Sequence, residues 1–467
     1  MITPIKQLKY RAQENWLLGY NSLEFLTLTE DLFQYFVNPI PQKILLAEPD
    51  PILFLASFIA ACSRGHHIFL ANPTWGLSEW QQVLDLVAPD IVWGNCECAQ
   101  QCYKSWRSSR LSNTNQSVNP LISQANSLIM IPTGGSSGKI RFAMHTWQTL
   151  MASVQGFREY FQLREVNSIC VLPLYHVSGL MQFMRSFSSG GQFLVLPFKE
   201  LKSGKLTNFD PQEFFISLVP TQLQTILNDS HLTAWLSRCS TVLLGGAPAW
   251  DELLEKARFH NIRLAPSYGM TETASQIATL NPASFLNGKK DSYRILPHVN
   301  LKICNEKGKC LDSQQTGFIA ISSPSLALGY YPELFSESGV FYPDDIGFVD
   351  EEGVLQIIGR SSDKIITGGE NVFPCEVETA IRSTGRVKDV FVVGKPDNYW
   401  GQIISAVYVP TNLDISPQQL REALVGKIAH FKIPKLWLKI QEIPRNEQGK
   451  INRQQIQELL SQHQSEL

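Results

Sequence analysis

Short apolar runs alternate with longer amphipathic segments through the first part of the chain. Residues 43–72 predict a strand, a buried helix and a strand, and residues 79–94 predict a helix and a strand. The alternation continues through "NSICVLPLYH", "GQFLVLPF", "FISLVPTQLQTIL" and "STVLLGGAPAWDELLEKARFHNIRLAPSYG". Strands that alternate with helices predict parallel sheets with helices on both faces.

From about Tyr293 the pattern changes to short strands joined by tight turns. "RILPHVNLKICNEKGKCLD", "GFIAISSPSLALGYY" and "VFYPDDIGFVDEEGVLQIIGR" contain no long helical segment. They predict a more antiparallel, barrel-like β subdomain over about 293–358.

The last hundred or so residues predict a small α+β unit. Helical patterns in "PCEVETAIRST" and "SPQQLREALVGKIAHF" alternate with strand patterns in "VKDVFVVGK", "QIISAVYVP" and "KLWLKIQEI". The prediction is therefore an α/β fold with a large domain over 1–361 and a small domain over 362–467. We expect the hinge near Ser362 and Asp363.

Composition narrows the class of protein. The chain of 467 residues is 44% hydrophobic and 18% charged, which favours a large core over disorder. A net charge of -2 gives no electrostatic footprint for nucleic acid or an anionic membrane. The apolar run 51–62 is too short to span a bilayer, and the first residues lack the apolar core of a signal peptide.

Nine cysteines are scattered without a CxxC pair, as in a cytosolic protein with reduced thiols. Cys96, Cys98 and Cys102 lie close together, but their spacing is not that of a zinc site and no histidine flanks them. We expect incidental thiols there, on a loop or a helix edge. The prediction is a soluble cytoplasmic protein.

A loop rich in glycine and serine lies at "MIPTGGSSGKI", residues 130–140. The P-loop of kinases and GTPases has the pattern GxxxxGK[ST]. When Gly138 and Lys139 are aligned with it, Thr133 occupies the first glycine position and Ile140 the Ser/Thr position. A P-loop of this type is therefore not expected.

The loop nevertheless has the chemistry of an anion site. Glycines let backbone N–H groups turn toward an anion without interference from side chains. The hydroxyls of Thr133, Ser136 and Ser137 and the charge of Lys139 add donors. A flexible surface turn is the alternative for this loop taken alone.

Four further stretches place polar residues in turns. They are "YGMTETAS" (268–275), "DDIGFVDEEG" (344–353), "GRSSDKIITGGENVFPCEVE" (359–378) and "PRNEQGKINR" (444–453). Together with the glycine loop, their order and content resemble the adenylate-forming superfamily of acyl-CoA synthetases, luciferases and peptide-synthetase adenylation domains. The resemblance covers essentially the whole chain.

The resemblance implies a reaction in two halves. A carboxylate attacks the α-phosphorus of ATP, which gives an acyl-adenylate and pyrophosphate. A thiol, usually that of coenzyme A, then displaces AMP. Because the first half builds negative charge on an anionic phosphate, the site needs donors and cations around it.

The resemblance also implies roles for residues around the nucleotide. Glu272 would hold Mg²⁺, and Thr271 would bond to a phosphate oxygen. Tyr268 would stack on the adenine, and Gly269 beside it would also contact the nucleotide. The ribose hydroxyls would be met by Asp345, and Arg360 would reach the ribose or a phosphate. The loop around the departing phosphates would consist of Thr133, Gly134, Gly135, Ser136, Ser137, Gly138 and Lys139. The backbone of Gly246, Ala247 and Pro248 would pass along the adenine edge.

Lys450 is the implied catalytic residue of adenylation, because a charge on a flexible stem bridges the carboxylate and the α-phosphate. The small domain would then pivot at Ser362 and Asp363 for the second half. Gly368 and Gly369 would line the pantetheine tunnel. A solvated lysine in a turn is the alternative for Lys450.

Two departures from the family pattern stand out. The usual Thr-Gly-Asp is here Pro343, Asp344 and Asp345, and the usual Pro-Lys-Gly after the glycine loop is Ile140-Arg141-Phe142. Arg141 keeps a charge in place of the second lysine.

The acyl pocket is expected around "LPLYHVSGL" and "SLVPTQL". His176, Ser178 and Thr221 are the candidate substrate-binding residues, with Arg185 as a further donor. Such a mixed pocket suits an aromatic acid with two carboxylates. Tyr175 and Phe183 would make the contacts with its ring. The alternatives are an aryl or medium-chain acyl-CoA ligase and a non-catalytic nucleotide-binding protein. Expected partners are a carboxylic acid, ATP, Mg²⁺ and coenzyme A, without nucleic acid or membrane insertion; self-association stays an open alternative.

Overall fold

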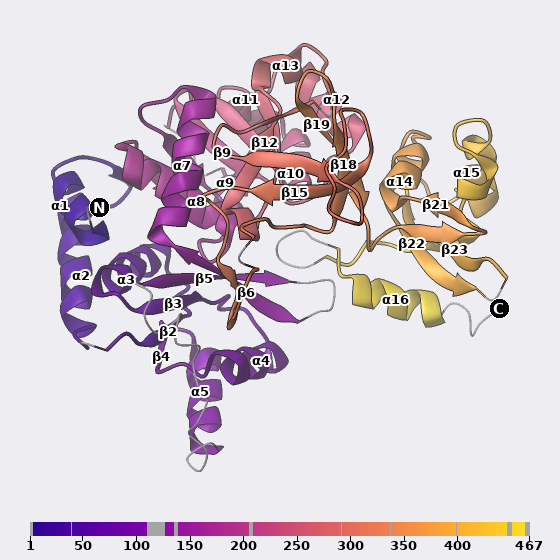
Figure 1. Ribbon diagram of the computed structural model, residues 1–467. Coiled ribbons are helices and arrows are strands. Elements are labelled where there is room, and N and C mark those ends of the chain that lie inside the picture. The colour runs from indigo at the N-terminus through magenta and orange to yellow at the C-terminus, as the bar shows by residue number, and fades with distance from the viewer. Residues whose placement is uncertain are drawn as a thin grey trace.

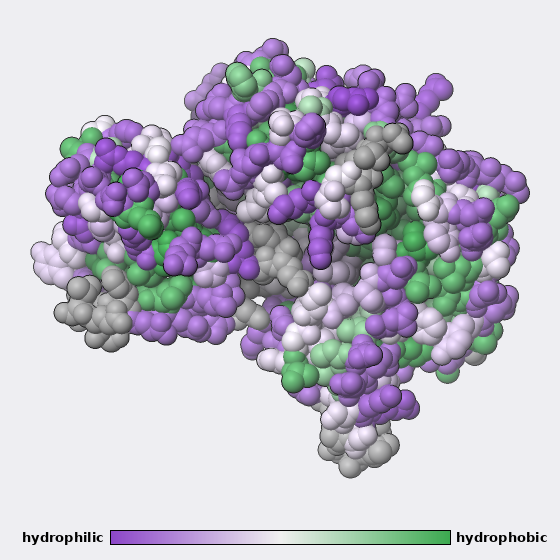
Figure 2. Space-filling model, turned by 180° about the vertical axis from the view of Figure 1, so that it is seen from behind, coloured by the Kyte–Doolittle hydropathy of each residue, from purple (hydrophilic) through white to green (hydrophobic). Residues whose placement is uncertain are grey.

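The structure is a computed structural model with a large lobe and a small C-terminal lobe (Figure 1). It describes residues 3–38, 40–109, 127–134, 139–204, 209–290, 292–336, 338–397, 399–445 and 451–462. Seen from behind, the surface is hollowed between the two lobes (Figure 2). Among the described residues, no helix is both long enough and apolar enough to cross a lipid bilayer.

A 12-stranded sheet dominates the large lobe. Its first part is parallel, in the order β1 (Leu17–Leu18), β8 (Phe193–Val195), β7 (Asn167–Cys170), β9 (Phe214–Leu218), β10 (Thr241–Leu244) and β11 (Leu264–Met270). This is the parallel sheet that the alternating pattern predicts, because each crossover carries a helix.

The same sheet continues with antiparallel strands beyond β11. They follow in the order β12 (Ser275–Thr279), β13 (Tyr293–Ile295), β19 (Val354–Arg360), β18 (Asp345–Val349), β15 (Gly317–Ser322) and β14 (Asn300–Cys304). The antiparallel region expected from Tyr293 onward is thus an extension of the parallel sheet, joined to it through β11 and β12.

A second, 7-stranded sheet lies beside the first. Its order is β17 (Glu333–Leu334), β16 (Gly329–Tyr330), β6 (Ile140–Thr146), β5 (Leu128–Gly134), β3 (His67–Leu70), β2 (Lys43–Leu46) and β4 (Ile91–Trp93). Successive side chains of its inner strands pack on opposite faces: Ile44 and Leu46 belong to one core cluster and Leu45 to another. Burial on both faces explains why these strands are continuously apolar.

Helices fill the space on both faces of the sheets. The second sheet packs against α3 (Pro51–Arg64) on one face and α4 (Leu77–Val87) on the other. The first sheet packs against α7 (Trp147–Phe161) and α8 (Val177–Ser189) on one face and α10 (Pro220–Leu227), α11 (Ser230–Leu236) and α12 (Asp251–Phe259) on the other. Shorter or peripheral helices are α1 (Pro4–Arg11), α2 (Ser22–Tyr35), α5 (Glu97–Ser109), α9 (Phe198–Lys202) and α13 (Pro282–Leu286).

The start and end of α3 follow from its sequence. Asp50 accepts hydrogen bonds from the N–H groups of Ile52 and Leu53, which otherwise lack partners in the first turn. Gly65 ends the helix with φ 82°, a left-handed conformation that favours glycine. The residues 54–62 are all buried, so the apolar run is a core helix as predicted.

The small lobe has its own 5-stranded sheet. Its strands are β20 (Ile365–Thr367), β21 (Glu370–Val372), β22 (Val387–Asp397), β23 (Gly401–Pro410) and β24 (Leu436–Lys439), with helices α14 (Pro374–Arg382), α15 (Pro417–Leu424) and α16 (Arg453–Gln462). The helix predicted over 416–431 was too long: α15 ends at Leu424. Gly426 then has φ 81°, and a separate 3₁₀ turn covers His430–Lys432.

Candidate active site

Four of the predicted site segments lie at one edge of the large sheet. The parallel strands β7, β9, β10 and β11 are neighbours, and each has a predicted segment at or after its carboxyl end. His176 and Ser178 follow β7, Thr221 follows β9, the stretch 246–248 follows β10, and Tyr268 lies near the end of β11. Open α/β sheets bind ligands outside the carboxyl ends of their strands, which makes this edge the candidate site.

The glycine loop connects β5 to β6 as a β-hairpin. Thr133 pairs with Arg141 and Gly134 with Ile140 at the base of the loop, and Lys139 is exposed. The predicted residues Gly135, Ser136, Ser137 and Gly138 lie outside the described residues. A P-loop leads from a strand into a helix, whereas this loop leads into another strand. The hairpin is therefore a second argument against a P-loop.

Glu272 lies in a short 3₁₀ turn, Thr271–Thr273, between β11 and β12. It is 7% exposed, and its Oε1 accepts a hydrogen bond of 2.6 Å from the Tyr330 hydroxyl. Within the described part of the chain, Oε2 has no hydrogen-bond donor and no cation within salt-bridge distance. One oxygen is thus oriented and the other remains open, as a carboxylate that shares a magnesium ion with phosphates requires.

His145 fixes the turn that carries Glu272. Its ring is completely buried, and Nε2 donates a hydrogen bond of 2.8 Å to the Thr271 carbonyl. Nδ1 lies 3.0 Å from the Thr149 hydroxyl. Burial lowers the pKa of His145 to about 4, so the ring is neutral near neutral pH. The sequence of "YGMTETAS" does not indicate that His145 on β6 supports this turn.

Asp345 lies at the start of β18 and is 6% exposed. Its Oδ2 accepts a hydrogen bond of 2.6 Å from the Tyr268 hydroxyl, and its Oδ1 lies 3.3 Å from Nε of Arg360. The sheet register places Asp345 directly opposite Arg360. The structure therefore brings three predicted nucleotide-binding residues into contact. Burial, followed by the charge of Asp345, raises the pKa of Tyr268, which keeps its hydroxyl a donor.

The unusual sequence after the glycine loop has a structural explanation. The Arg141 guanidinium lies 4.1 Å from the centre of the Tyr330 ring, and Tyr330 is the residue that bonds to Glu272. Phe142 is fully buried and packs edge-on against Phe69 at 5.3 Å. Tyr330 was missed in the sequence, where "LGYY" carries no sign of its role.

Arg185 on α8 is 2% exposed and has no carboxylate partner among the described residues. One of its terminal nitrogens, Nη2, lies 3.0 Å from the Ser275 hydroxyl, and its guanidinium carbon lies 4.1 Å from the centre of the Phe157 ring. Its Nε is buried without a hydrogen-bond partner. Burial lowers the pKa of Arg185 to about 9. An unpaired buried cation is costly, so this group is a candidate anion-binding residue.

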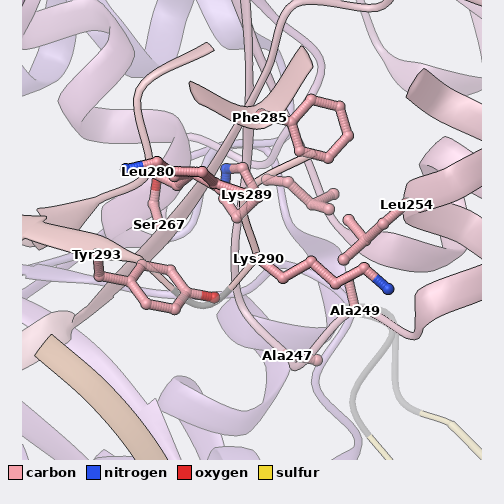
Figure 3. A pocket seen from close by; sticks show the side chains of 11 residues that line it. Ala247, Ala249, Leu254, Ser267, Leu280, Phe285, Lys289, Lys290 and Tyr293 are labelled. Carbon is pink, nitrogen blue, oxygen red and sulfur yellow. The ribbon is translucent and has the colours of Figure 1, made fainter. Parts of the chain in front are cut away.

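The loop after β10 supplies backbone rather than side chains. Gly246 has φ 84°, and residues 246–248 are exposed. Ala247 and Ser267, from the ends of β10 and β11, line a cavity of about 40 Å³ together with Tyr293 (Figure 3). The described backbone of this loop is therefore available to a ligand at the sheet edge.

The predicted residues of the small lobe that the structure describes belong to its own sheet and to the linker before it, not to the edge of the large sheet. Gly368 and Gly369 form the two-residue turn between β20 and β21, both with positive φ, as such tight hairpins require. The Gly368 N–H donates to the Trp400 carbonyl at 2.9 Å. Ser362 and Asp363 lie between β19 and β20, and Asp363 binds the guanidinium of Arg453. Lys450 lies outside the described residues.

The cysteine cluster has no metal-like arrangement. Cys98 and Cys102 lie on α5, and Cys96 precedes it, with its thiol 3.2 Å from the Pro73 carbonyl. In the described ranges, no three His, Cys, Asp or Glu side chains are grouped so that they could hold a metal ion.

Comparison with known proteins agrees with the fold. The sequence model of the AMP-binding enzyme family matches residues 41–331, and that of the AMP-binding enzyme C-terminal domain matches residues 376–450. Since the first match alone covers more than half of the chain, the protein belongs to the AMP-binding enzyme family.

Curated relatives carry a more specific name. The 2-succinylbenzoate–CoA ligase of Listeria monocytogenes serotype 4b (strain F2365) is 35% identical over 343 residues, which are 70% of this chain and 68% of that protein. The enzyme of the same name from Geobacillus sp. (strain WCH70) is 32% identical over 335 residues, with the same coverage of 70% and 68%.

Solved structures share the fold over almost the whole chain. The o-succinylbenzoate CoA synthetase (MenE) of Bacillus subtilis, in complex with the acyl-adenylate intermediate OSB-AMP, has a TM-score of 0.84, 23% identity and 98% coverage of both chains. ATP-bound MatB from Rhodopseudomonas palustris has a TM-score of 0.83, 21% identity and the same coverage of both chains.

Proposed function

We propose that this protein is an ATP-dependent acid–CoA ligase that converts 2-succinylbenzoate into its CoA thioester, a step toward menaquinone or phylloquinone. The names of the curated relatives support this substrate, and the fold supports the reaction class. The observation that carries the specific substrate is Arg185, a buried cation without a carboxylate partner in the described structure.

In the first half reaction, a carboxylate oxygen of the acid attacks the α-phosphorus of ATP. The bond between the α-phosphorus and the bridging oxygen breaks, and pyrophosphate leaves with the electron pair. We assign the adenine edge to Tyr268, Gly269 and the stretch 246–248, and the ribose to Asp345 and Arg360. The glycine loop, 133–139, would hold the departing phosphates, as backbone N–H groups and hydroxyls in a hairpin turn allow.

Glu272 is the proposed Mg²⁺ ligand, and Thr271 the proposed phosphate contact beside it. When bound, Mg²⁺ would neutralise charge that develops on the phosphate oxygens. The Tyr330 hydroxyl would hold Glu272 in the orientation that leaves its second oxygen open. Mg²⁺ usually keeps several waters and takes one or two protein carboxylates, so a single glutamate fits this cation.

The acyl pocket would lie beside the ends of β7 and β9. His176, Ser178 and Thr221 follow these strands, and Arg185 projects from α8, which begins directly after His176. We assign Arg185 to the carboxylate of the substrate that does not react, because a charge-assisted contact there would compensate the buried cation. The succinyl carboxylate would remain free to meet ATP.

In the second half reaction, the sulfur of coenzyme A attacks the acyl carbon, and AMP leaves with the electron pair. We propose that Lys450 serves the first half only and that the small lobe, 362–467, pivots at Ser362 and Asp363 between the halves. Gly368 and Gly369 would then line the path of the pantetheine. The present contact of Asp363 with Arg453 supports the pivot, because it ties the linker to the helix that follows Lys450.

The nine cysteines are all free thiols. We therefore also propose a reducing, cytoplasmic compartment for this protein.

The deciding assay is pyrophosphate release from ATP and Mg²⁺ with a panel of acids, with and without coenzyme A. We expect release with 2-succinylbenzoate well above that with benzoate or a medium-chain fatty acid. Pyrophosphate release with none of the acids would overturn the proposed ligase activity. Pyrophosphate release with the monocarboxylates alone would overturn only the proposed substrate.

Arg185 is tested with a matched pair of substrates. The compound 4-oxo-4-phenylbutanoate has the succinyl chain but lacks the ring carboxylate. The wild type should prefer 2-succinylbenzoate in kcat/KM, and Arg185→Gln should lose about 10- to 100-fold of that preference, the worth of one charge-assisted contact. A preserved preference in a variant with an unchanged melting temperature would contradict the assignment.

The role of Lys450 is tested by separating the two halves. Lys450→Ala should abolish formation of the acyl-adenylate but spare thioester formation from supplied acyl-adenylate. Equal loss of both halves would contradict a role confined to adenylation.

A further inference from the structure

Two cysteines face each other across a tight hairpin at the edge of the large sheet. Cys304 is the last residue of β14, and Cys310 pairs with it in an isolated antiparallel bridge. The Asn305 N–H donates to the Lys309 carbonyl at 2.9 Å, and the Leu311 N–H donates to the Ile303 carbonyl at 2.8 Å. Because the backbone hydrogen bonds flank the two cysteines, they form a non-hydrogen-bonded pair. Their sulfur atoms are 3.9 Å apart.

This geometry is within reach of a disulfide. Residues of a non-hydrogen-bonded antiparallel pair have Cα atoms about 4.5 Å apart, and disulfides join Cα atoms about 4.4–6.8 Å apart. Rotation about side-chain bonds is therefore sufficient to bring the two sulfur atoms together. The hairpin itself does not have to open.

The other close pair of cysteines provides a contrast. Cys98 and Cys102 are four residues apart on α5. On a helix, such positions hold their Cβ atoms about 5–6 Å apart, whereas a disulfide needs about 3.5–4.5 Å. A bridge there would distort the helix, so proximity alone does not select the reactive pair.

The two thiols of the hairpin differ in access. Cys310 is exposed, whereas Cys304 is buried. Lys307 and Lys309, both exposed, precede Cys310 in the sequence "NEKGKC". Burial, followed by the contact with Cys310, raises the pKa of Cys304. An incoming oxidant therefore meets Cys310 first, with Cys304 behind it.

We propose that Cys304 and Cys310 form a reversible thiol–disulfide site that is oxidised by low-molecular-weight disulfides such as glutathione disulfide. The Cys310 thiolate attacks one sulfur of the small disulfide, and one thiolate leaves. Cys304 then loses its proton to solvent and attacks the Cys310 sulfur, which expels the second thiolate. The protein loses two electrons and two protons in total, and one small disulfide becomes two thiols.

The site lies one row of the sheet away from Asp345 and uses none of the residues proposed for the ligase. Cys304 pairs with Phe318 on β15, and Phe318 pairs with Ile346 on β18, the neighbour of Asp345. The inference does not depend on the proposed function, and its test needs no ligase substrate.

Peptide mapping tests the proposal on the full-length protein. The protein is incubated with glutathione disulfide, remaining thiols are alkylated, and trypsin is added without reductant. Trypsin cleaves after Lys307 and Lys309, so the two cysteines fall on separate peptides, 303–307 and 310–360. We expect these peptides to be joined, with a yield at least about tenfold above any link between Cys98 and Cys102. Dithiothreitol should reverse the link.

Two variants distinguish the steps. Cys304→Ser should trap glutathione on Cys310, because no second thiol can expel it, and Cys310→Ser should give neither link nor adduct on the hairpin. The double variant Cys98→Ser/Cys102→Ser should leave the link unchanged. A stable glutathione adduct on wild-type Cys310, unreacted thiols at both positions, or equal linkage of Cys98 and Cys102 would each overturn the proposal.

Discussion

Two carboxylates at the sheet edge are held in the same way and differ in what surrounds them. Glu272 and Asp345 are equally buried, and each accepts a hydrogen bond of 2.6 Å from a tyrosine hydroxyl. The second oxygen of Asp345 faces Arg360, whereas the second oxygen of Glu272 faces no cation among the described residues. Asp345 is thus partly neutralised by its own protein, and Glu272 is not.

The difference indicates different ligands. A carboxylate with a protein cation beside it is suited to accept hydrogen bonds from neutral hydroxyls, such as those of a ribose. A buried carboxylate without one is stabilised by a cation that arrives with the substrate. The arginine near Glu272, Arg141, touches the tyrosine ring instead of the carboxylate. It therefore leaves the Glu272 carboxylate free for the metal that we propose there.

The largest effect should come from removing each charge in turn. Glu272→Gln keeps an acceptor for Tyr330 but loses the charge for Mg²⁺, so kcat of pyrophosphate release should fall about 100- to 1000-fold. Asp345→Asn should instead raise KM for ATP about 10- to 100-fold and change kcat little. Steady-state kinetics with varied ATP and Mg²⁺ separates the two patterns. The same pattern in both variants would remove the distinction between the carboxylates.

His145 supports only the Glu272 side, and its titration should show in stability. The folded pKa of about 4 lies below the ordinary 6.5, so the unfolded chain binds more protons between these values. Stability that is present above pH 6.5 is therefore lost as pH falls toward 4, by about 3 kcal/mol for this one group.

The control is His145→Gln, which keeps a donor for the Thr271 carbonyl but does not titrate. Urea unfolding at several pH values should give this variant a shallower loss of stability between pH 6.5 and 4 than the wild type. Parallel curves for the two proteins would show that His145 is not the titrating group.

The hydrogen bond from Tyr330 to Glu272 can be tested by removing the hydroxyl. Tyr330→Phe frees Glu272, and loss of a group that orients a metal ligand typically costs about 10- to 100-fold in metal affinity. The half-saturating Mg²⁺ concentration for pyrophosphate release should rise accordingly. Tyr160→Phe is the matched control, because its hydroxyl donates to the Thr279 carbonyl at 2.7 Å, away from both carboxylates. A similar rise in both variants would mean a general structural effect.

Arg141 should have the smallest effect, since an exposed cation over an aromatic ring contributes about 0.5–1 kcal/mol. Arg141→Gln should raise the half-saturating Mg²⁺ concentration about threefold, and Arg141→Lys should restore most of it because it keeps a cation over the ring. An increase in KM for ATP with unchanged Mg²⁺ dependence would instead indicate direct contact with a phosphate.

Much of the fold follows from local patterns. The alternation of short apolar runs with a longer apolar segment predicts the order of β2, α3 and β3, and Asp50 and Gly65 mark the ends of the helix. The end of α15 was misplaced because "LVGKIAHF" keeps a helical apolar pattern, while Gly426 adopts a left-handed conformation that stops the helix. The continuity of the large sheet through β11 and β12 depends on strand pairing, which the pattern of one strand does not reveal.

The candidate site was predictable where it follows strand ends and hidden where it depends on distant contacts. Tyr268 and Asp345 lie at strand ends, in stretches whose chemistry is visible in the sequence. Tyr330 reaches Glu272 from another sheet, across 58 positions of sequence, and His145 reaches Thr271 across 126. Such pairs arise from the packing of the two sheets, so neither residue type nor spacing signals them.

The most direct test of the account follows one oxygen atom. 2-Succinylbenzoate labelled with ¹⁸O in its succinyl carboxylate is incubated with the protein, ATP, Mg²⁺ and coenzyme A. The ¹⁸O content of the nucleotide and phosphate products is then measured by mass spectrometry. Attack of the carboxylate on the α-phosphorus predicts one labelled oxygen in AMP and none in pyrophosphate. Label in inorganic phosphate together with formation of ADP, or thioester formation without transfer of label to AMP, would contradict the adenylate mechanism.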